Sequence, residues 1–135
     1  MTYSQKPRKH ILVVDDEETI RKILHAYLGT KGYLVTTAKS GDNAIQIYER
    51  SGDKKNKETC CPVDLILTDL NMSPMDGYEL FKRIKAKDSQ ARICVMSANP
   101  YDPKIEEMRK EGLKGVLPKP FIMDGLEKLV KSALK

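Results

Sequence analysis

Short apolar runs alternate along this chain with segments in which apolar residues recur every three or four positions. The first run, HILVV at residues 10–14, ends abruptly at four consecutive acidic residues, a pattern typical of a buried parallel strand. Apolar side chains of the next segment occupy one face of a helix, at Ile20, Ile23, Leu24, Tyr27 and Leu28. We therefore predict a strand followed by a helix, which Gly29 and Gly32 bring to an end.

The alternation of strand and helix recurs four more times. We expect further strands over residues 33–38, 63–69, 91–96 and 115–117. Start signals for the next three helices are Ser40, Asp76 with Glu79, and Asp102 with Pro103. The closing helix carries apolar residues at helical spacing, namely Leu126, Leu129, Val130 and Leu134. Five strand–helix repeats predict an α/β domain with a doubly wound parallel sheet and helices on both faces.

Length and composition fit one ordinary folded domain. The chain has 135 residues, 40% hydrophobic and 32% charged, and this length suffices to fold without disulfides or a structural metal. No apolar run approaches the roughly 20 residues of a membrane span, and the first ten residues contain no apolar run of signal-peptide length. We expect a cytoplasmic protein with a flexible basic N-terminus over residues 1–9, one domain over residues 10–135 and no membrane partner.

The three cysteines do not have the spacing of a metal site. Cys60 and Cys61 are adjacent within a polar segment, and Cys94 lies inside an apolar run. Adjacent cysteines rarely bridge each other, so we expect reduced thiols.

The charge balance is basic, with 24 Lys and Arg residues against 19 Asp and Glu residues and a formal net charge of +5. Such a balance favours a nucleic-acid partner only where the cations cluster. Here local density occurs only at residues 6–9 and 54–57, and no aromatic residues interleave with these cations. We expect a solvated basic surface and no direct contact with nucleic acid.

Polar residues stand at the carboxyl ends of four of the predicted strands. Asp15 and Asp16 follow the first strand, Asp69 ends the third, Ser97 the fourth, and Lys119 the fifth. Each of these residues alone is an ordinary helix cap or turn residue. Ligands of open α/β sheets bind outside the carboxyl ends of the strands, so the five side chains are expected at one edge. Three carboxylates placed together repel one another unless a cation is present.

The chemistry of this group of residues points to magnesium and phosphate. Hard oxygen ligands suit Mg²⁺, whereas the His and Cys ligands of a zinc site are missing from the group. With Mg²⁺ in place, one carboxylate can act as a nucleophile toward a phosphoryl group, while Lys119 and Ser97 absorb charge on the phosphoryl oxygens. Asp69 is the candidate nucleophile, because it stands between the acidic pair on one side and Ser97 and Lys119 on the other.

Four motifs, in order, carry a resemblance to a known family. ILVVDDE, LILTDLNMSPMDG, VMSA and LPKPF resemble the acidic pair, the phosphoacceptor segment, the hydroxyl residue and the Lys-Pro loop of response regulator receiver domains. The resemblance covers essentially the whole chain and is closest in kind to single-domain chemotaxis regulators. It implies a flavodoxin-like sheet of five strands in the order 2-1-3-4-5.

The resemblance also implies a role for each site residue. Asp69 accepts a phosphoryl group from the histidine of a sensor kinase or a phosphotransfer protein. Mg²⁺ is held by Asp15, Asp16, Asp69 and the backbone carbonyl of Asn71, Ser97 contacts the phosphoryl group, and Lys119 pairs with it. Because the donor histidine lies on another protein, neither His10, which has no partner at useful spacing, nor His25, expected on the surface, is a candidate donor.

Three features depart from the family pattern. The segment Met72-Ser73-Pro74-Met75 stands where Met-Pro-X-Met is usual, so the local shape of this loop is expected to differ. Val116 stands three residues before Lys119, where an aromatic residue is common, so an aromatic rotamer switch is absent. The loop over residues 51–61 is longer than usual and lies away from the predicted site.

The function predicted from these residues is a phosphorylation-controlled switch that is not an enzyme acting on free substrates. The family docks an effector protein or output domain, or forms a phosphorylation-dependent homodimer, through the fourth helix, fifth strand and fifth helix. The alternative is a Mg²⁺-dependent phosphohydrolase with an Asp nucleophile. Hydrolases of the haloacid dehalogenase kind place a second acid two residues after the nucleophile, where this sequence has Asn71. Asn71 and Asn99, each two residues after a site residue, could border the path of an attacking water, with turn chemistry as the competing explanation.

Overall fold

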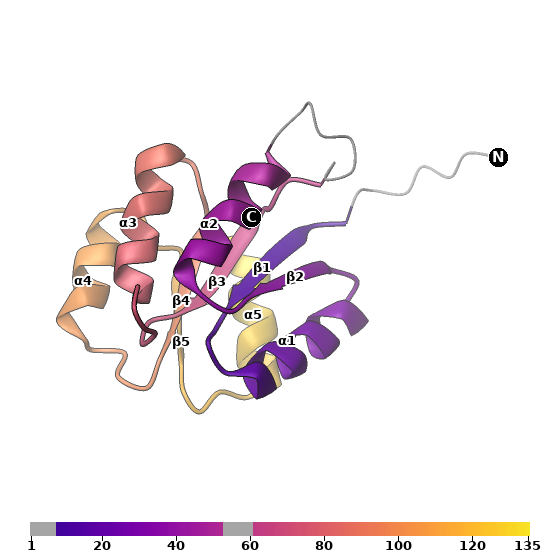
Figure 1. Ribbon diagram of the computed structural model, residues 1–135. Coiled ribbons are helices and arrows are strands. Elements are labelled where there is room, and N and C mark those ends of the chain that lie inside the picture. The colour runs from indigo at the N-terminus through magenta and orange to yellow at the C-terminus, as the bar shows by residue number, and fades with distance from the viewer. Residues whose placement is uncertain (1–7, 53–60) are drawn as a thin grey trace.

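The computed structural model describes residues 8–52 and 61–135, and within them five strands alternate with five helices (Figure 1). The strands are β1 (His10–Val14), β2 (Leu34–Ala38), β3 (Leu65–Asp69), β4 (Ile93–Ser97) and β5 (Gly115–Pro118). The helices are α1 (Glu18–Thr30), α2 (Gly41–Ser51), α3 (Gly77–Lys87), α4 (Pro103–Lys110) and α5 (Met123–Ala133).

All neighbouring strands pair in parallel, in the order β2-β1-β3-β4-β5. Helices α1 and α5 cover one face of the sheet, and α2, α3 and α4 cover the other (Figure 1). This is the predicted doubly wound, flavodoxin-like fold, and the predicted strand order is confirmed.

Burial explains why β1, β3 and β4 read as continuous apolar runs in the sequence. Every residue of these three strands is buried, because each strand has a neighbour on both sides and helices above and below. Successive side chains point to opposite faces: Leu12 and Val14 pack with α2 and α3, whereas Ile11 and Val13 pack with α1 and α5. Strands β2 and β5 form the edges and are only partly buried.

The predicted helix start signals act as caps. The Ser40 side chain accepts the Asn43 N–H at 3.1 Å, and Asp76 accepts the Glu79 N–H at 2.8 Å. Asp102 accepts the Lys104 N–H at 2.9 Å. These bonds satisfy backbone donors that have no partner inside the helix, which fixes where α2, α3 and α4 begin.

Two expectations about α1 are wrong in detail. Ile23 was expected on the buried face but is 41% exposed, because it lies on the flank of a narrower stripe that contains the buried Leu24 and Leu28. Gly29 does not end the helix, which continues to Thr30. The chain turns at Gly32, whose φ of +93° lies in the left-handed region that favours glycine.

The expectation that His10 has no partner is also wrong. His10 lies inside β1 and is 6% exposed, and both ring nitrogens are within hydrogen-bond distance of a partner. Nδ1 lies 2.8 Å from the carbonyl oxygen of Cys61, and Nε2 lies 2.8 Å from Oγ1 of Thr36. Because a carbonyl can only accept, Nδ1 donates to the Cys61 carbonyl, and the Thr36 hydroxyl is the partner of Nε2. His25 is on the surface as predicted.

Cys94 is a buried free thiol, whereas Cys61 is exposed. Burial raises the pKa of the Cys94 thiol to about 12, so it is un-ionised at neutral pH and unreactive. Cys60, residues 1–7 of the predicted N-terminus, and residues 53–60 of the long loop lie outside the described residues. None of the described helices is long and apolar enough to cross a membrane.

Candidate functional site

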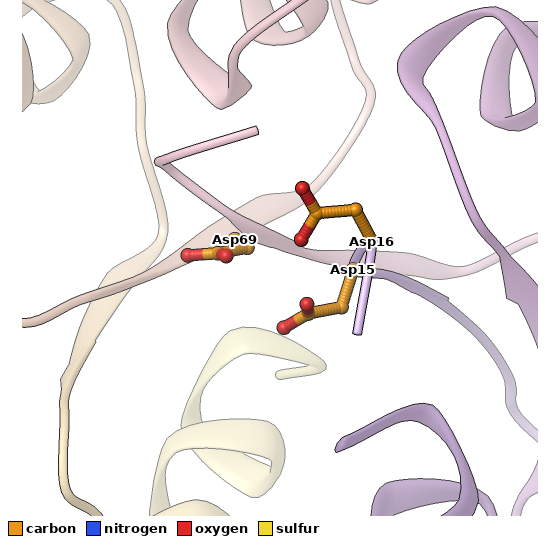
Figure 2. Close-up of side chains that lie close together, drawn as sticks. All are labelled: Asp15, Asp16 and Asp69. Atoms are coloured by element: carbon orange, nitrogen blue, oxygen red, sulfur yellow. The ribbon is translucent and has the colours of Figure 1, made fainter. Parts of the chain in front are cut away.

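The candidate site lies where β1 and β3, adjacent in the sheet, reach their carboxyl ends (Figure 2). Asp15 directly follows β1, and Asp69 is the last residue of β3. One carboxylate oxygen from each of Asp15, Asp16 and Asp69 lies within 4.8 Å of the others. The convergence of the three predicted acids at one edge of the sheet is therefore confirmed.

Asp15 is fully buried, and its polar atoms are nearly all bonded. Its N–H donates to the carbonyl of Ala38 at 3.1 Å, and Oδ1 accepts the Glu17 N–H at 2.9 Å. Oδ2 is the one buried side-chain oxygen or nitrogen of the described residues that has no hydrogen-bond partner. A buried carboxylate oxygen without a donor is costly, so this atom marks a place where a ligand would be favourable.

Lys119 supplies the positive charge of the site. Its Nζ lies 3.2 Å from Oδ1 of Asp69 and 3.6 Å from Oδ2 of Asp15. Its backbone N–H donates to the carbonyl of Ser97 at 2.8 Å, which ties the loop after β5 to the end of β4. Lys119 therefore touches the acids through its side chain and the neighbouring loop through its backbone.

Negative charge remains in excess at this edge of the sheet. Burial raises the pKa of the Asp15 carboxyl above its ordinary value of 3.8, and the charges of Asp69 and Asp16 act in the same direction. The Glu17 N–H and the Lys119 ammonium oppose this shift but do not cancel it. One ammonium against three carboxylates leaves the site suited to a further cation.

Ser97 is the buried last residue of β4, beside β3, but its hydroxyl is engaged in its own loop. Oγ donates to the carbonyl of Asn99 at 2.9 Å and accepts the Asn99 N–H at 3.0 Å. The Asn99 side chain in turn accepts the Tyr101 N–H at 3.1 Å. Turn chemistry thus accounts for the contacts of Asn99 in this structure.

The loop after Asp69 is held close to the site. The Asn71 N–H lies 3.4 Å from Oδ1 of Asp69, a long contact. Met72 and Met75 are buried, so the departure from the usual motif still yields a loop anchored by two methionines. Met96 and Met108 are likewise buried, so these methionines serve in packing.

Gly77 lies very close to the backbone of Asp69 and Leu70, a contact that the sequence motif alone does not predict. A Cβ at this position would lie 2.9 Å from the Leu70 Cα and closer still to the backbone oxygen of Asp69. The Gly77 N–H donates to the Leu70 carbonyl at 2.8 Å. Helix α3 therefore begins directly against the backbone of Asp69, which only a residue without a Cβ allows.

Comparison with known proteins agrees with this geometry. The family model of the response regulator receiver domain matches residues 11–131, and the chain belongs to this family. It is 33% identical over 132 residues to the two-component response regulator ARR15 of Arabidopsis thaliana, covering 96% of this chain. The chain spans 64% of the length of ARR15.

Two solved structures show the same fold. The chemotaxis protein CheY4 of Vibrio cholerae has a TM-score of 0.81 and 28% identity, covering 95% of this chain and 100% of that one. The response regulator protein TrrA of Thermotoga maritima, solved in complex with Mg²⁺-BeF, has a TM-score of 0.73 and 30% identity. The coverage of this second match is 93% of this chain and 99% of that one. The comparisons give no support to the phosphohydrolase alternative.

Proposed function

We propose that Asp69 accepts a phosphoryl group from the histidine of a sensor kinase or phosphotransfer protein, in a Mg²⁺-dependent reaction that switches the conformation of the domain. The observation that carries the proposal is the cluster of Asp15, Asp16 and Asp69 with Lys119 against it, at the carboxyl edge of a receiver-domain sheet. Residues 10–135 make up the proposed receiver domain.

The residues present fit Mg²⁺. The unpartnered Oδ2 of Asp15 and the excess of carboxylate charge both favour a hard divalent cation at this point. Asp15, Asp16 and Asp69 would hold it, with the backbone carbonyl of Asn71 as a further ligand proposed from the family motif. When bound, Mg²⁺ neutralises carboxylate charge and polarises the phosphoryl oxygens. The Mg²⁺-BeF complex of the similar protein TrrA supports this assignment.

Phosphoryl transfer follows from the positions of the protein groups. A carboxylate oxygen of Asp69 attacks phosphorus and forms an acyl phosphate, while the bond from phosphorus to the donor histidine nitrogen breaks and that nitrogen keeps the electron pair. Before the attack, Lys119 orients the Asp69 carboxylate through its contact with Oδ1. Ser97 can donate to a phosphoryl oxygen once its hydroxyl rotates away from the Asn99 carbonyl.

The proposed switch spreads through the loops after β4 and β5. Lys119 is bonded to Ser97 through its backbone, so charge added at Asp69 acts on both loops together. These loops lead into α4 and α5, and the proposed surface for an effector, an output domain or a second copy is α4, β5 and α5. Tyr101 and Ile122, in the same loops, are 85% and 72% exposed. Val116, half-buried in β5, has no ring to reorient.

The proposed activity is limited to gain and loss of the phosphoryl group on the protein itself. Asn71 occupies the position of the second acid of an aspartate-based hydrolase, and an amide cannot take part in general acid–base catalysis as a carboxylate does. We propose a cytoplasmic setting for the reaction, and the buried free thiol of Cys94 is in keeping with a reducing compartment.

Intact mass tests the proposal. The protein is incubated with Mg²⁺ and a small acyl phosphate donor, and the expected product carries one phosphoryl group. Asp69→Ala should abolish the mass increase, whereas Asp102→Ala, which removes an acid that caps α4 outside the cluster, should leave it unchanged. Equal phosphorylation of wild type and Asp69→Ala would refute the assignment of the acceptor.

A further inference from the structure

Arg21 reaches from α1 to the backbone of the metal-binding segment. Its Nη1 donates to the carbonyl oxygen of Asp15 at 2.8 Å. The guanidinium is charged and the acceptor belongs to a fully buried residue, so this is a charge-assisted bond at the margin of the site. Sequence spacing alone does not single out Arg21, because it lies in the second turn of a helix with no site residue beside it.

The bond completes the restraint of Asp15. The Ala38 carbonyl accepts its N–H, the Glu17 N–H is donated to Oδ1, and Arg21 donates to its carbonyl. The one remaining acceptor is the unpartnered Oδ2, 3.6 Å from Nζ of Lys119. These three bonds, to Ala38 in β2, to the N-cap residue Glu17 and to Arg21 in α1, thus leave a single oxygen of Asp15 available to a cation.

Arg21 also acts on Asp16. The Asp15 carbonyl belongs to the peptide group that joins Asp15 to Asp16, and this group is planar. A rotation of this peptide changes the backbone angles on either side of it, and with them the direction of the Asp16 side chain, which now places a carboxylate oxygen within 4.8 Å of one from Asp15 and one from Asp69. The guanidinium holds this peptide in the orientation that brings the carboxylates together.

From these contacts we infer that Arg21 is a positioning residue for the divalent-cation site, acting through the peptide between Asp15 and Asp16. The inference rests on the proposed function, since it assumes that the three carboxylates bind Mg²⁺. It adds a residue outside the ligand set on which the affinity of that set depends. Partners that orient metal ligands typically change metal affinity by roughly 10-fold to 100-fold when removed.

Lys22 offers a matched control on the same helix. Arg21 and Lys22 both border a hollow of about 310 Å³ between α1 and β2, together with Glu18, His25 and Thr37. Lys22 pairs with Glu18 at 3.1 Å on the solvent side and makes no hydrogen bond to the site among the described residues. Removal of either cation changes the net charge of α1 equally, so the difference between them isolates the contact to Asp15.

The experiment measures Mg²⁺ binding by titration calorimetry for wild type, Arg21→Gln, Lys22→Gln and Arg21→Lys, each checked for native folding by thermal unfolding in the absence of metal. We expect Arg21→Gln to weaken Mg²⁺ binding roughly 10-fold. Lys22→Gln should stay within about twofold of wild type, since an exposed charge is well screened. Arg21→Lys should recover part of the loss, because one charged donor is restored. In phosphorylation by a small donor, Arg21→Gln should raise the Mg²⁺ concentration for half-maximal rate, with little loss of rate at saturating Mg²⁺.

Three outcomes would overturn the inference. Equal Mg²⁺ affinities of Arg21→Gln and Lys22→Gln, with tight binding by wild type, would refute the role of Arg21 and leave the proposed function standing. If Arg21→Gln does not fold, Arg21→Lys decides the question. A Mg²⁺ affinity of Arg21→Lys equal to that of Lys22→Gln would then also refute the inference. Absence of Mg²⁺ binding by wild type would refute the proposed function and this inference together.

Discussion

Lys119 contacts Asp69 with its side chain, Nζ to Oδ1 at 3.2 Å, while its backbone N–H is bonded to the carbonyl of Ser97 at 2.8 Å. The same residue therefore contacts the proposed acceptor and is bonded to the end of β4, where the loop that precedes α4 begins. We propose that this arrangement couples charge at Asp69 to the structural response and leaves the chemistry of phosphorylation separate from it.

Lys119→Ala should still be phosphorylated on Asp69 but should lose the conformational response, because no ammonium remains to pair with the charge that the phosphoryl group adds. Hydrogen exchange with and without a phosphodonor measures the response. Wild type should change protection over residues 101–119, whereas Lys119→Ala should not. Equal changes in both proteins would refute the coupling role, and changes confined to α1 and α2 would rule out α4, β5 and α5 as the output surface.

Asp15→Asn should stabilise the metal-free protein at neutral pH by an amount on the order of 1 kcal/mol, because one buried charge is removed from a cluster of three acids that repel one another. Burial and the neighbouring carboxylates already hold the pKa of Asp15 above its ordinary value. Urea unfolding in the presence of a metal chelator measures this gain in the free energy of unfolding. In Mg²⁺ the order should reverse, since only wild type gains the free energy of metal binding. A variant less stable than wild type under both conditions would contradict the account.

The ionised Asp76 carboxylate should make part of the free energy of unfolding depend on pH. Burial favours its neutral form, but the bond from Lys104, at 2.8 Å, and the N–H groups of Glu79 and Tyr78 hold its pKa below the ordinary value of 3.8. A lowered folded-state pKa gives stability that is complete above the unfolded value and is lost as pH falls through the folded value.

Asp76→Asn keeps a good helix cap and removes the charge. Its loss of stability should therefore be below about 1 kcal/mol at neutral pH, since Lys104 is half exposed. The difference from wild type should shrink below pH 3.8. Urea unfolding between about pH 7 and pH 2 follows this difference. A difference that does not change with pH would show that the ion pair contributes nothing.

Gly77→Ala should destabilise the fold by roughly 1–3 kcal/mol and slow phosphorylation, because its Cβ would be forced against Leu70 and the backbone of Asp69. Gly29→Ala is the matched control, since a Cβ there meets nothing within 4 Å. Inside α1 that change should be neutral or stabilising by up to about 1 kcal/mol. Thermal unfolding of both variants measures the contrast, and equal stabilities would refute the close approach at Gly77.

The fold could be predicted from sequence because its signals are local. Buried parallel strands read as apolar runs, caps such as Ser40 and Asp76 precede their helices, and parallel strands bring their carboxyl ends to one edge. The clustering of Asp15 and Asp69 followed from that topology alone.

Contacts between side chains and distant backbone could not be predicted in the same way. The partners of the His10 ring are Thr36 on a neighbouring strand and the backbone carbonyl of Cys61, and neither has a characteristic spacing in the sequence. The bond from Arg21 to the Asp15 carbonyl is equally hidden, because backbone acceptors are the same in every residue. The exposure of Ile23 depends on how α1 sits on the sheet, which periodicity alone does not define.

The central claim, phosphorylation of Asp69, is tested most directly by locating the modified residue. Borohydride reduces an aspartyl phosphate to homoserine, so peptide mass spectrometry after phosphorylation and reduction identifies the acceptor. The account predicts homoserine at position 69 alone, dependent on Mg²⁺ during phosphorylation. Modification at Asp15 or Asp16 with none at position 69, or a phosphoryl group found on His10 or His25 instead, would contradict it.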